Sequence, residues 1–230
     1  MIDFTKFEEK IGLKFKNKEL LKTALTHRSY VNEHQNEVSE HNERLEYLGD
    51  AVLELVTTHY LYEKFSQENE GALTAYRSAL VNTTSLSQVA EKLEINNFLQ
   101  LSKGEAKDTG RARTFIMANA VEAIIGAIYL DQGYVIVQKF IADNFFGKIN
   151  EVVKNNLWQD AKSNFQEKAQ EIVKITPNYQ VLEETGPDHD KRFRVGVFLN
   201  NKLVAEGEGV SKQEAEQSAA EEALKAKQWG

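Results

Sequence analysis

The first two-thirds of the chain place apolar residues at the three- and four-residue spacing of amphipathic helices. The pattern recurs over Phe15–Tyr30, Arg44–Phe65, Ala72–Lys92, Thr114–Leu130 and Tyr134–Val153. Polar segments separate these stretches, at Asn32–Asn42, Gln67–Gly71 and Ser102–Arg113. Neither the alternation typical of strands nor any proline occurs in this part of the sequence. We therefore expect residues 1–153 to form an all-helical domain.

The pattern changes after the polar stretch Asn155–Asp160, which indicates a linker over residues 154–159. A helical pattern over Ser163–Ile175 precedes three strand-like stretches, at Tyr179–Glu184, Arg192–Leu199 and Lys202–Glu208. Asn200–Asn201 suits a tight hairpin turn, because asparagine tolerates positive φ. Ser211 and Glu214 have the spacing of a capping box at the start of a last helix. The order α-β-β-β-α predicts a small α+β domain over residues 160–230, so the chain is multidomain.

Composition by itself does not point to a partner. The 230 residues are 41% hydrophobic and 27% charged, which is typical of a globular protein. The absence of cysteine excludes disulfides and thiolate metal sites. The net charge is −7, and from Asp160 onward 13 acidic residues face 10 basic ones, which is unusual for a protein that binds a polyanion. A nucleic-acid function therefore has to rest on local arrangement.

Three carboxylates, Glu43, Glu46 and Asp50, fall within an arc of roughly 60° on one helix. The apolar stripe of the same helix is expected on another side, at Leu45, Leu48, Val52 and Leu55. Carboxylates on one face repel each other unless a positive charge lies between them, and Mg²⁺ prefers oxygen ligands of this kind. A solvated charged face is the plainer interpretation when this helix is considered alone.

A second expected helix, the one that contains Glu122, favours a metal site over a solvated charged face. Glu122 is the only charged residue between Arg113 and Asp131, so we expect its carboxylate to be at least partly buried. Burying a carboxylate without a partner costs roughly several kcal/mol. A basic side chain or a metal ion therefore has to compensate for its charge. Asn119 lies one turn earlier on the same face and offers a neutral oxygen. Oxygen donors from two helices would make a Mg²⁺ site.

The residues of this site lie in stretches that resemble a known family. His41–Leu53 resembles the signature of the ribonuclease III family, nearly position for position. Other matching stretches are Thr26–Tyr30, Arg77–Asn82, Lys103–Glu105, Val121–Ala123, Ile125–Ala127 and Tyr129–Asp131. Residues from about 160 to 228 resemble the double-stranded RNA-binding domain, in Phe165–Glu167, Pro177–Tyr179, Gly186–His189, Gly207–Gly209, Ser211–Glu216 and Ala219–Ala220. Together the resemblances cover nearly the whole chain.

The resemblance implies a Mg²⁺-dependent endonuclease that forms a homodimer and hydrolyses double-stranded RNA, such as ribosomal RNA precursors, to 5′-phosphate and 3′-hydroxyl ends. Mn²⁺ is expected to substitute for Mg²⁺, and no small-molecule cofactor is implied. By resemblance the metal ligands are Glu46, Asp50, Asn119 and Glu122, and the catalytic residues are Asp50, Glu122 and Glu43. Tyr47 matches an aromatic residue of the dimer interface, and Glu70 matches a further acidic residue of the catalytic valley.

The C-terminal resemblance implies contacts with A-form RNA, which is recognised through its shape, its 2′-hydroxyls and its phosphates. Gln166 and Glu167 in the first helix would reach minor-groove hydroxyls, and His189 would enter the next minor groove. Lys212 at a helix N-terminus would meet phosphate. Each of these residues alone is more simply a surface residue, and only the spaced set points to RNA.

One departure leaves an alternative open. The family usually has Asp at position 119, where this chain has Asn, so we expect weaker Mg²⁺ binding or a changed metal preference. The rival hypothesis is a catalytically impaired protein that binds duplex RNA without cutting it. A purely structural helical dimer leaves Glu122 unexplained and ranks last.

Other classes of protein are not indicated. The N-terminal residues lack the basic-then-apolar order of a signal peptide, and the apolar run from Phe115 to Leu130 is short for a membrane span and contains Glu122. We therefore expect a cytoplasmic protein without a membrane partner. His27, His34, His41 and His59 do not have the spacing of a zinc site.

Overall fold

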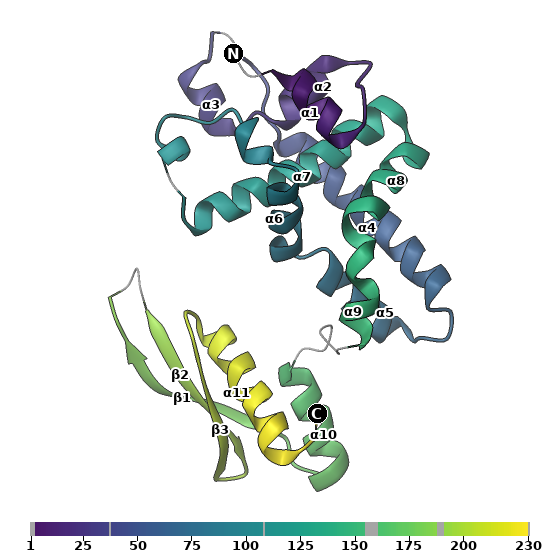
Figure 1. The fold of residues 1–230 in the computed structure, drawn as a ribbon. Helices are drawn as coiled ribbons and strands as arrows, with labels where there is room; N and C mark the ends of the chain where they lie inside the picture. Colours follow the sequence, from purple (N-terminus) through teal and green to yellow (C-terminus); the bar gives the residue numbers. More distant parts are fainter. Residues whose placement is uncertain (1–2, 37, 108, 155–160, 188–190, 230) are drawn as a thin grey trace. The chain divides into compact units, whose positions relative to one another are not determined.

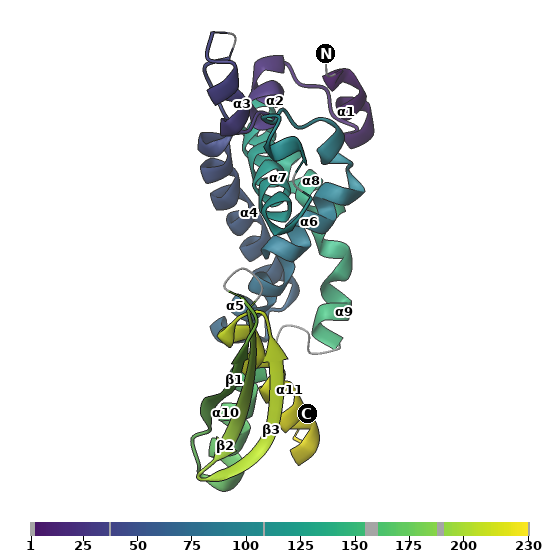
Figure 2. The ribbon, with the colours of Figure 1, turned by 90° about the vertical axis from the view of Figure 1, so that its left-hand side faces the viewer.

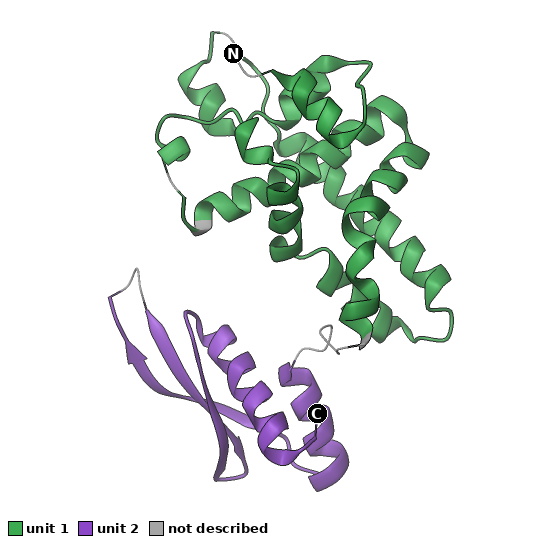
Figure 3. Ribbon diagram, in the orientation of Figure 1, with its two compact units in different colours: residues 1–158 green, residues 159–230 purple. Residues whose placement is uncertain are grey.

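The computed structural model describes residues 3–36, 38–107, 109–154, 161–187 and 191–229, apart from the side chains of Arg111 and Lys154. The chain divides into two compact units, residues 1–158 and 159–230 (Figure 3). The linker expected over residues 154–159 falls almost wholly outside the described residues.

Unit 1 is helical in its described part, apart from one short bridge (Figure 1). Its α-helices are α1 (Phe4–Ile11), α2 (Lys18–Ala24), α3 (Arg28–Glu33), α4 (Glu43–Lys64), α5 (Glu70–Leu80), α6 (Thr83–Lys92), α7 (Arg111–Gln132), α8 (Tyr134–Phe145) and α9 (Ile149–Lys154). Three 3₁₀ turns join them, η1 (Ile95–Asn97), η2 (Glu105–Lys107) and η3 (Phe146–Lys148). The all-helical prediction for this part of the chain is confirmed.

The centre of unit 1 is α7, which the views of Figures 1 and 2 both place among the other helices. It packs against α4, α6, α8 and α2. A run of its apolar side chains is completely buried, at Ala120, Val121, Ala123, Ile124, Ile125, Ala127 and Ile128. Among the residues described, the segment Ala112–Gln132 is the one helix long and apolar enough to cross a membrane, and it is mostly buried. Its composition is therefore that of a core helix.

The continuous helix expected over Phe15–Tyr30 is wrong, because the chain leaves the helical conformation between α2 and α3. Thr26 forms a short parallel bridge with Gln100 instead. The backbone N–H of Gln100 donates to the carbonyl of Leu25 (2.8 Å), and that of His27 donates to the carbonyl of Gln100 (3.0 Å). A pairing between positions this far apart overrides the local apolar spacing.

Two more expected helices are divided, and one core residue was misplaced. The pattern over Ala72–Lys92 breaks between α5 and α6, where the Asn82 side chain accepts a hydrogen bond from the backbone N–H of Ser85 (2.9 Å) and starts α6. The pattern over Tyr134–Val153 is interrupted by η3. Leu55, expected in the apolar stripe of α4, is 58% exposed.

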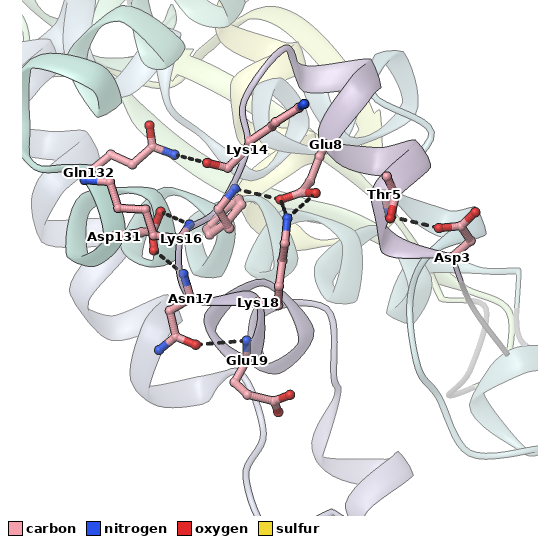
Figure 4. Close-up of polar contacts among 11 residues, drawn as sticks. Asp3, Thr5, Glu8, Lys14, Lys16, Asn17, Lys18, Glu19, Asp131 and Gln132 are labelled. Atoms are coloured by element: carbon pink, nitrogen blue, oxygen red, sulfur yellow. Dashed lines mark hydrogen bonds and ion pairs between the residues drawn. The ribbon is translucent and has the colours of Figure 1, made fainter.

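Two carboxylates fix the segment between α1 and α2 (Figure 4). Glu8 is only 4% exposed, and it accepts hydrogen bonds from the backbone N–H of Phe15 (2.6 Å) and from Lys18 Nζ (2.5 Å). Asp131, near the end of α7, accepts from the backbone N–H groups of Lys16 and Asn17 (2.9 and 2.8 Å). The N-terminal helix is thereby tied to the core helix.

Unit 2 has two helices on one antiparallel sheet, in the predicted order. Its elements are α10 (Ala161–Val173), β1 (Asn178–Thr185), β2 (Arg192–Leu199), β3 (Lys202–Gly209) and α11 (Lys212–Lys227), with strand order β1-β2-β3. Its core contains Phe165, Val197, Ala219, Ala220 and Ala223. The α+β prediction is confirmed.

The turns of unit 2 follow from particular residues. Asn200 has φ +55°, the left-handed conformation that the hairpin between β2 and β3 was expected to need. Ser211 caps α11 by accepting from the backbone N–H of Glu214 (3.2 Å). The Glu214 side chain accepts from the backbone N–H of Val210 (3.0 Å), one residue before the cap rather than at the cap itself.

Candidate active site

The candidate site lies where α4 crosses α7. At this crossing Gly49 faces the backbone carbonyl of Glu122, and a Cβ atom on Gly49 would overlap that oxygen. Gly126 meets α4 in the same way, because a Cβ atom there would overlap the carbonyl oxygen of Leu45. One glycine from each helix therefore lets the two backbones touch.

The close crossing decides which polar side chains meet. Glu46 and Asp50 flank Gly49 on α4, and Asn119 and Glu122 lie one turn apart on α7. Glu46, Asn119 and Glu122 are half-buried, whereas Asp50 is exposed. The charges of Asp50 and Glu46 both act on Glu122, and the Asn119 side chain hydrogen-bonds to Glu46. Four oxygen-bearing side chains thus come together from two helices.

Glu122 is the most perturbed carboxyl group of the set. Burial raises its pKa to about 7, and the negative charges of Asp50 and Glu46 add to the rise. The expectation that this carboxylate would be partly buried agrees with its position in the structure. A carboxyl group with a pKa near neutrality can hold or release a proton under ordinary conditions.

The pKa of Glu46 is also raised, first by burial and then by the charge of Glu43. The hydrogen bond from Asn119 acts in the opposite direction, because an amide N–H that donates to a carboxylate stabilises its charged form. The charge of Asp50 contributes a smaller rise. Negative charge is therefore concentrated around Glu46.

No cationic side chain in the described part of the chain forms an ion pair with Glu46, Asp50 or Glu122. Glu43 is different, because Arg28 Nη1 lies 3.2 Å from one of its carboxylate oxygens and His41 Nδ1 lies 3.8 Å from the other. Glu43 is exposed, and it is not among the residues whose charge raises the pKa of Glu122. It stands at the rim of the site.

The donor set fits a hard divalent cation. Among the described residues, no three His, Asp or Glu side chains are close enough together to hold a metal ion by themselves. Mg²⁺ does not need three such ligands, because it usually keeps several waters and binds protein through one or two carboxylates. Carboxylate oxygens that lack a cationic partner, beside the Asn119 amide oxygen, suit such an ion.

The residues assigned to the dimer and to the rest of the valley lie elsewhere on unit 1. Tyr47 is 83% exposed, and Leu55 and Tyr62, also exposed, fall within roughly 80° of it around α4. The 22 residues of α4 span roughly 33 Å, and Glu70 begins α5, which follows the end of α4 opposite Glu43. Within one subunit the structure does not bring Glu70 to the site.

The expected RNA contacts of unit 2 are exposed where the structure describes them. Gln166 and Glu167 lie on the outer side of α10, and Lys212 is the first residue of α11. Lys212 Nζ lies 5.7 Å from the centre of the Phe193 ring. His189 lies outside the described residues.

Two kinds of residue escaped the sequence analysis. Gly49 and Gly126 occur in stretches that matched the family, but their role in the helix crossing was not inferred. The available signal was that glycine inside a helix costs about 1 kcal/mol relative to alanine, so it implies a packing reason. Arg28 was also missed, because only the fold places it beside Glu43.

Family models match both units. Residues 17–149 match the Ribonuclease-III-like family, and residues 161–227 match the double-stranded RNA binding motif. Together these two matches span both the helical unit and the sheet-containing unit.

Curated relatives and solved structures agree with these matches. A protein named Ribonuclease 3 from Clostridium botulinum (strain Alaska E43 / Type E3) is 44% identical over 222 residues, which cover 96% of this chain and 95% of that protein. Ribonuclease 3 from Bacillus cereus (strain G9842) is 46% identical, with 96% and 90% covered. A solved structure of the nuclease domain of ribonuclease III from Campylobacter jejuni is 40% identical in sequence and has a TM-score of 0.56. The match covers 62% of this chain and 99% of that one, and that structure was described for flexibility in a region involved in dimer formation.

Proposed function

Because the chain belongs to the ribonuclease III family, we propose that it is an endoribonuclease that hydrolyses phosphodiester bonds in double-stranded RNA. The observation that carries this proposal is the half-buried Glu122, whose pKa is raised by the charges of Asp50 and Glu46 and which has no cationic partner among the described side chains. A double-stranded RNA binding motif in the same chain supplies the substrate class.

The proposed cofactor is Mg²⁺, with Mn²⁺ as a substitute, held by Glu46, Asp50, Glu122 and the amide oxygen of Asn119. When bound, the ion lowers the pKa of a coordinated water and stabilises negative charge on the attacked phosphate. Glu122 has a pKa of about 7 without metal, and in its charged form beside the ion it would orient the attacking water by accepting a hydrogen bond, while the leaving 3′ oxygen takes its proton from solvent. The products then carry a 5′-phosphate and a 3′-hydroxyl. Glu43 is assigned an electrostatic role at the rim.

Unit 2 is proposed to hold the duplex. Gln166 and Glu167 would contact 2′-hydroxyls in one minor groove, His189 would contact the next groove, and Lys212 would meet the phosphates between them. Lys212 suits this role because it is exposed beside the free backbone N–H groups at the start of α11.

A homodimer is proposed through the exposed apolar face of α4 around Tyr47. A twofold interface uses the same patch on both subunits, and Tyr47, Leu55 and Tyr62 supply apolar side chains that unit 1 does not bury. Two subunits would place one site on each strand of a duplex. We propose that the enzyme acts in the cytoplasm on structured transcripts such as ribosomal RNA precursors.

The test is to incubate the purified full-length chain with a long RNA duplex, in Mg²⁺ and separately in Mn²⁺, beside the single-stranded RNA of the same sequence. Shortened duplex products with 5′-phosphate ends are expected, and the single strand is expected to stay intact. Glu122→Gln keeps the shape of the side chain and should abolish cutting while leaving duplex binding intact. Cutting of both RNAs alike, or equal cutting by Glu122→Gln, would contradict the assignment.

The rival hypothesis of a duplex-binding protein that does not cut is not favoured. Asn119 removes one charge, but Glu46, Asp50 and Glu122 all remain at the crossing, and Asn119 still offers an oxygen. Binding without cleavage in either metal, followed by cleavage in Asn119→Asp, would revive that hypothesis.

A further inference from the structure

The proposed active site presents a difficulty for its own substrate. Glu43, Glu46, Asp50 and Glu122 are all acidic, and a phosphate of the RNA backbone has to come close to them. Arg28 and His41 are the only side chains of the described residues within ion-pair distance of any of these four, both lie beside Glu43, and the Arg28 guanidinium is the one that always carries a positive charge. Positive charge available to an incoming strand is therefore located at this rim.

The Arg28 guanidinium can easily leave Glu43 for another anion. The Arg28 side chain is 63% exposed and that of Glu43 is 47% exposed, and they are joined by one contact of 3.2 Å. An exposed pair of this kind contributes little to stability. A guanidinium group binds phosphate strongly, with two parallel hydrogen bonds where the geometry allows.

We propose that Arg28 binds a backbone phosphate of the RNA duplex beside the reacting strand, and that Glu43 holds the guanidinium in place until the RNA arrives. This inference rests on the proposed function. It adds an RNA contact outside unit 2 and gives Glu43 a second role, as the resting partner of Arg28. Arg28 is well placed for this role because its neighbour His27 is fixed by the bridge to Gln100, and the backbone N–H of Asn42, just before α4, donates to the carbonyl of Thr26 (2.9 Å).

The test measures duplex binding rather than cleavage. All variants are made in the full-length Glu122→Gln protein with Mg²⁺ present, and a fluorescent RNA duplex longer than the ~16 bp spanned by one binding domain is titrated at several salt concentrations. Arg28→Ala should weaken binding about fivefold and reduce the slope of log affinity against log salt by about 1, the value for one phosphate contact. Arg28→Lys keeps the charge and should keep most of that slope.

Lys139→Ala is the matched control. Lys139 lies on α8, is 73% exposed and pairs with Asp143 at 2.7 Å, so this variant also removes one cation from an exposed ion pair of unit 1. It should leave both the affinity and the slope unchanged. Thermal unfolding of each variant checks that the fold is retained.

Glu43→Gln tests whether Glu43 acts on RNA binding through Arg28 or only through its own negative charge. Freeing Arg28 should tighten duplex binding about twofold to threefold, and this gain should be lost when Arg28→Ala is also present. An unchanged affinity and slope in Arg28→Ala, or an equal gain from Glu43→Gln with and without Arg28, would overturn the inference. Either result leaves the proposed nuclease activity intact, which is judged separately by cleavage in the protein with Glu122.

Discussion

The α-carbon of Gly49 in α4 lies against the carbonyl oxygen of Glu122 in α7, with no room for a Cβ atom between them. The contact fixes the distance between the two helices at the level of the site. Glu46 and Asp50 on one helix can act on Glu122 on the other only because the backbones approach this closely. Packing and chemistry therefore depend on the same glycine.

The first prediction concerns that contact. Gly49→Ala should destabilise the protein by about 3 kcal/mol or more, because the clash is with backbone and the helices have to move apart. It should also weaken Mg²⁺ binding, since the carboxylates separate. Urea unfolding and calorimetric titration measure the two effects. Gly147→Ala is the control, because a Cβ atom there meets nothing within 4 Å; equal losses in both variants would contradict the role of the crossing.

The second prediction concerns pH. The pKa of Glu122 is raised in the folded protein to about 7 from an ordinary value of 4.5, so between these values the folded state binds more protons than the unfolded state. The stability of the metal-free protein should therefore fall as pH rises from about 5 to about 7.5, by about 2 kcal/mol after allowance for solvent screening. Urea unfolding with chelator across this range measures the fall.

Two comparisons make the pH prediction specific to Glu122. Glu122→Gln cannot lose a proton, so its stability should change less over the same range. Mg²⁺ should restore stability most strongly at the high end, because the ion binds the charged carboxylate and displaces its proton. A profile that is the same in both proteins would show that Glu122 is not the group that titrates.

The third prediction concerns Asn119. Asn119→Asp adds a fourth carboxylate and removes the amide that donates to Glu46. Without metal the variant should be less stable than the parent, because like charges are brought together. Mg²⁺ should bind about tenfold more tightly, because the ion gains a charged ligand. Calorimetric titration decides this, and an unchanged or weaker affinity would mean that the side chain at position 119 does not face the ion.

The sequence was sufficient to predict those helices and strands whose apolar residues are regularly spaced. The expected helix over Arg44–Phe65 became α4, and the order of elements in unit 2 followed from strand alternation, Asn200 and Ser211. It was also sufficient to predict the partial burial of Glu122, because a single charged residue in an apolar helix is expected to face the core. These features are local, and local spacing can report them.

Features that depend on distant residues were missed or misplaced. The break between α2 and α3 depends on Gln100, and the exposure of Leu55 depends on what the surrounding helices leave uncovered. The pairing of Arg28 with Glu43 joins residues that spacing does not relate. Helical geometry gave the arc of Glu43, Glu46 and Asp50, but only the crossing at Gly49 shows that the last two face Glu122.

The last prediction concerns the ion pair between Glu8 and Lys18, which joins α1 to the start of α2. Glu8 is nearly inaccessible to solvent, whereas the Lys18 side chain is 60% exposed (Figure 4). Lys18→Met leaves a buried carboxylate with only the Phe15 N–H as a partner, and it should cost about 3 kcal/mol. Glu8→Gln keeps an acceptor for that N–H and leaves Lys18 in contact with water, so it should cost only about 1 kcal/mol. Urea unfolding measures the stability of both variants. Equal losses of stability would show that the burial of the Glu8 carboxylate is not what makes the removal of Lys18 costly.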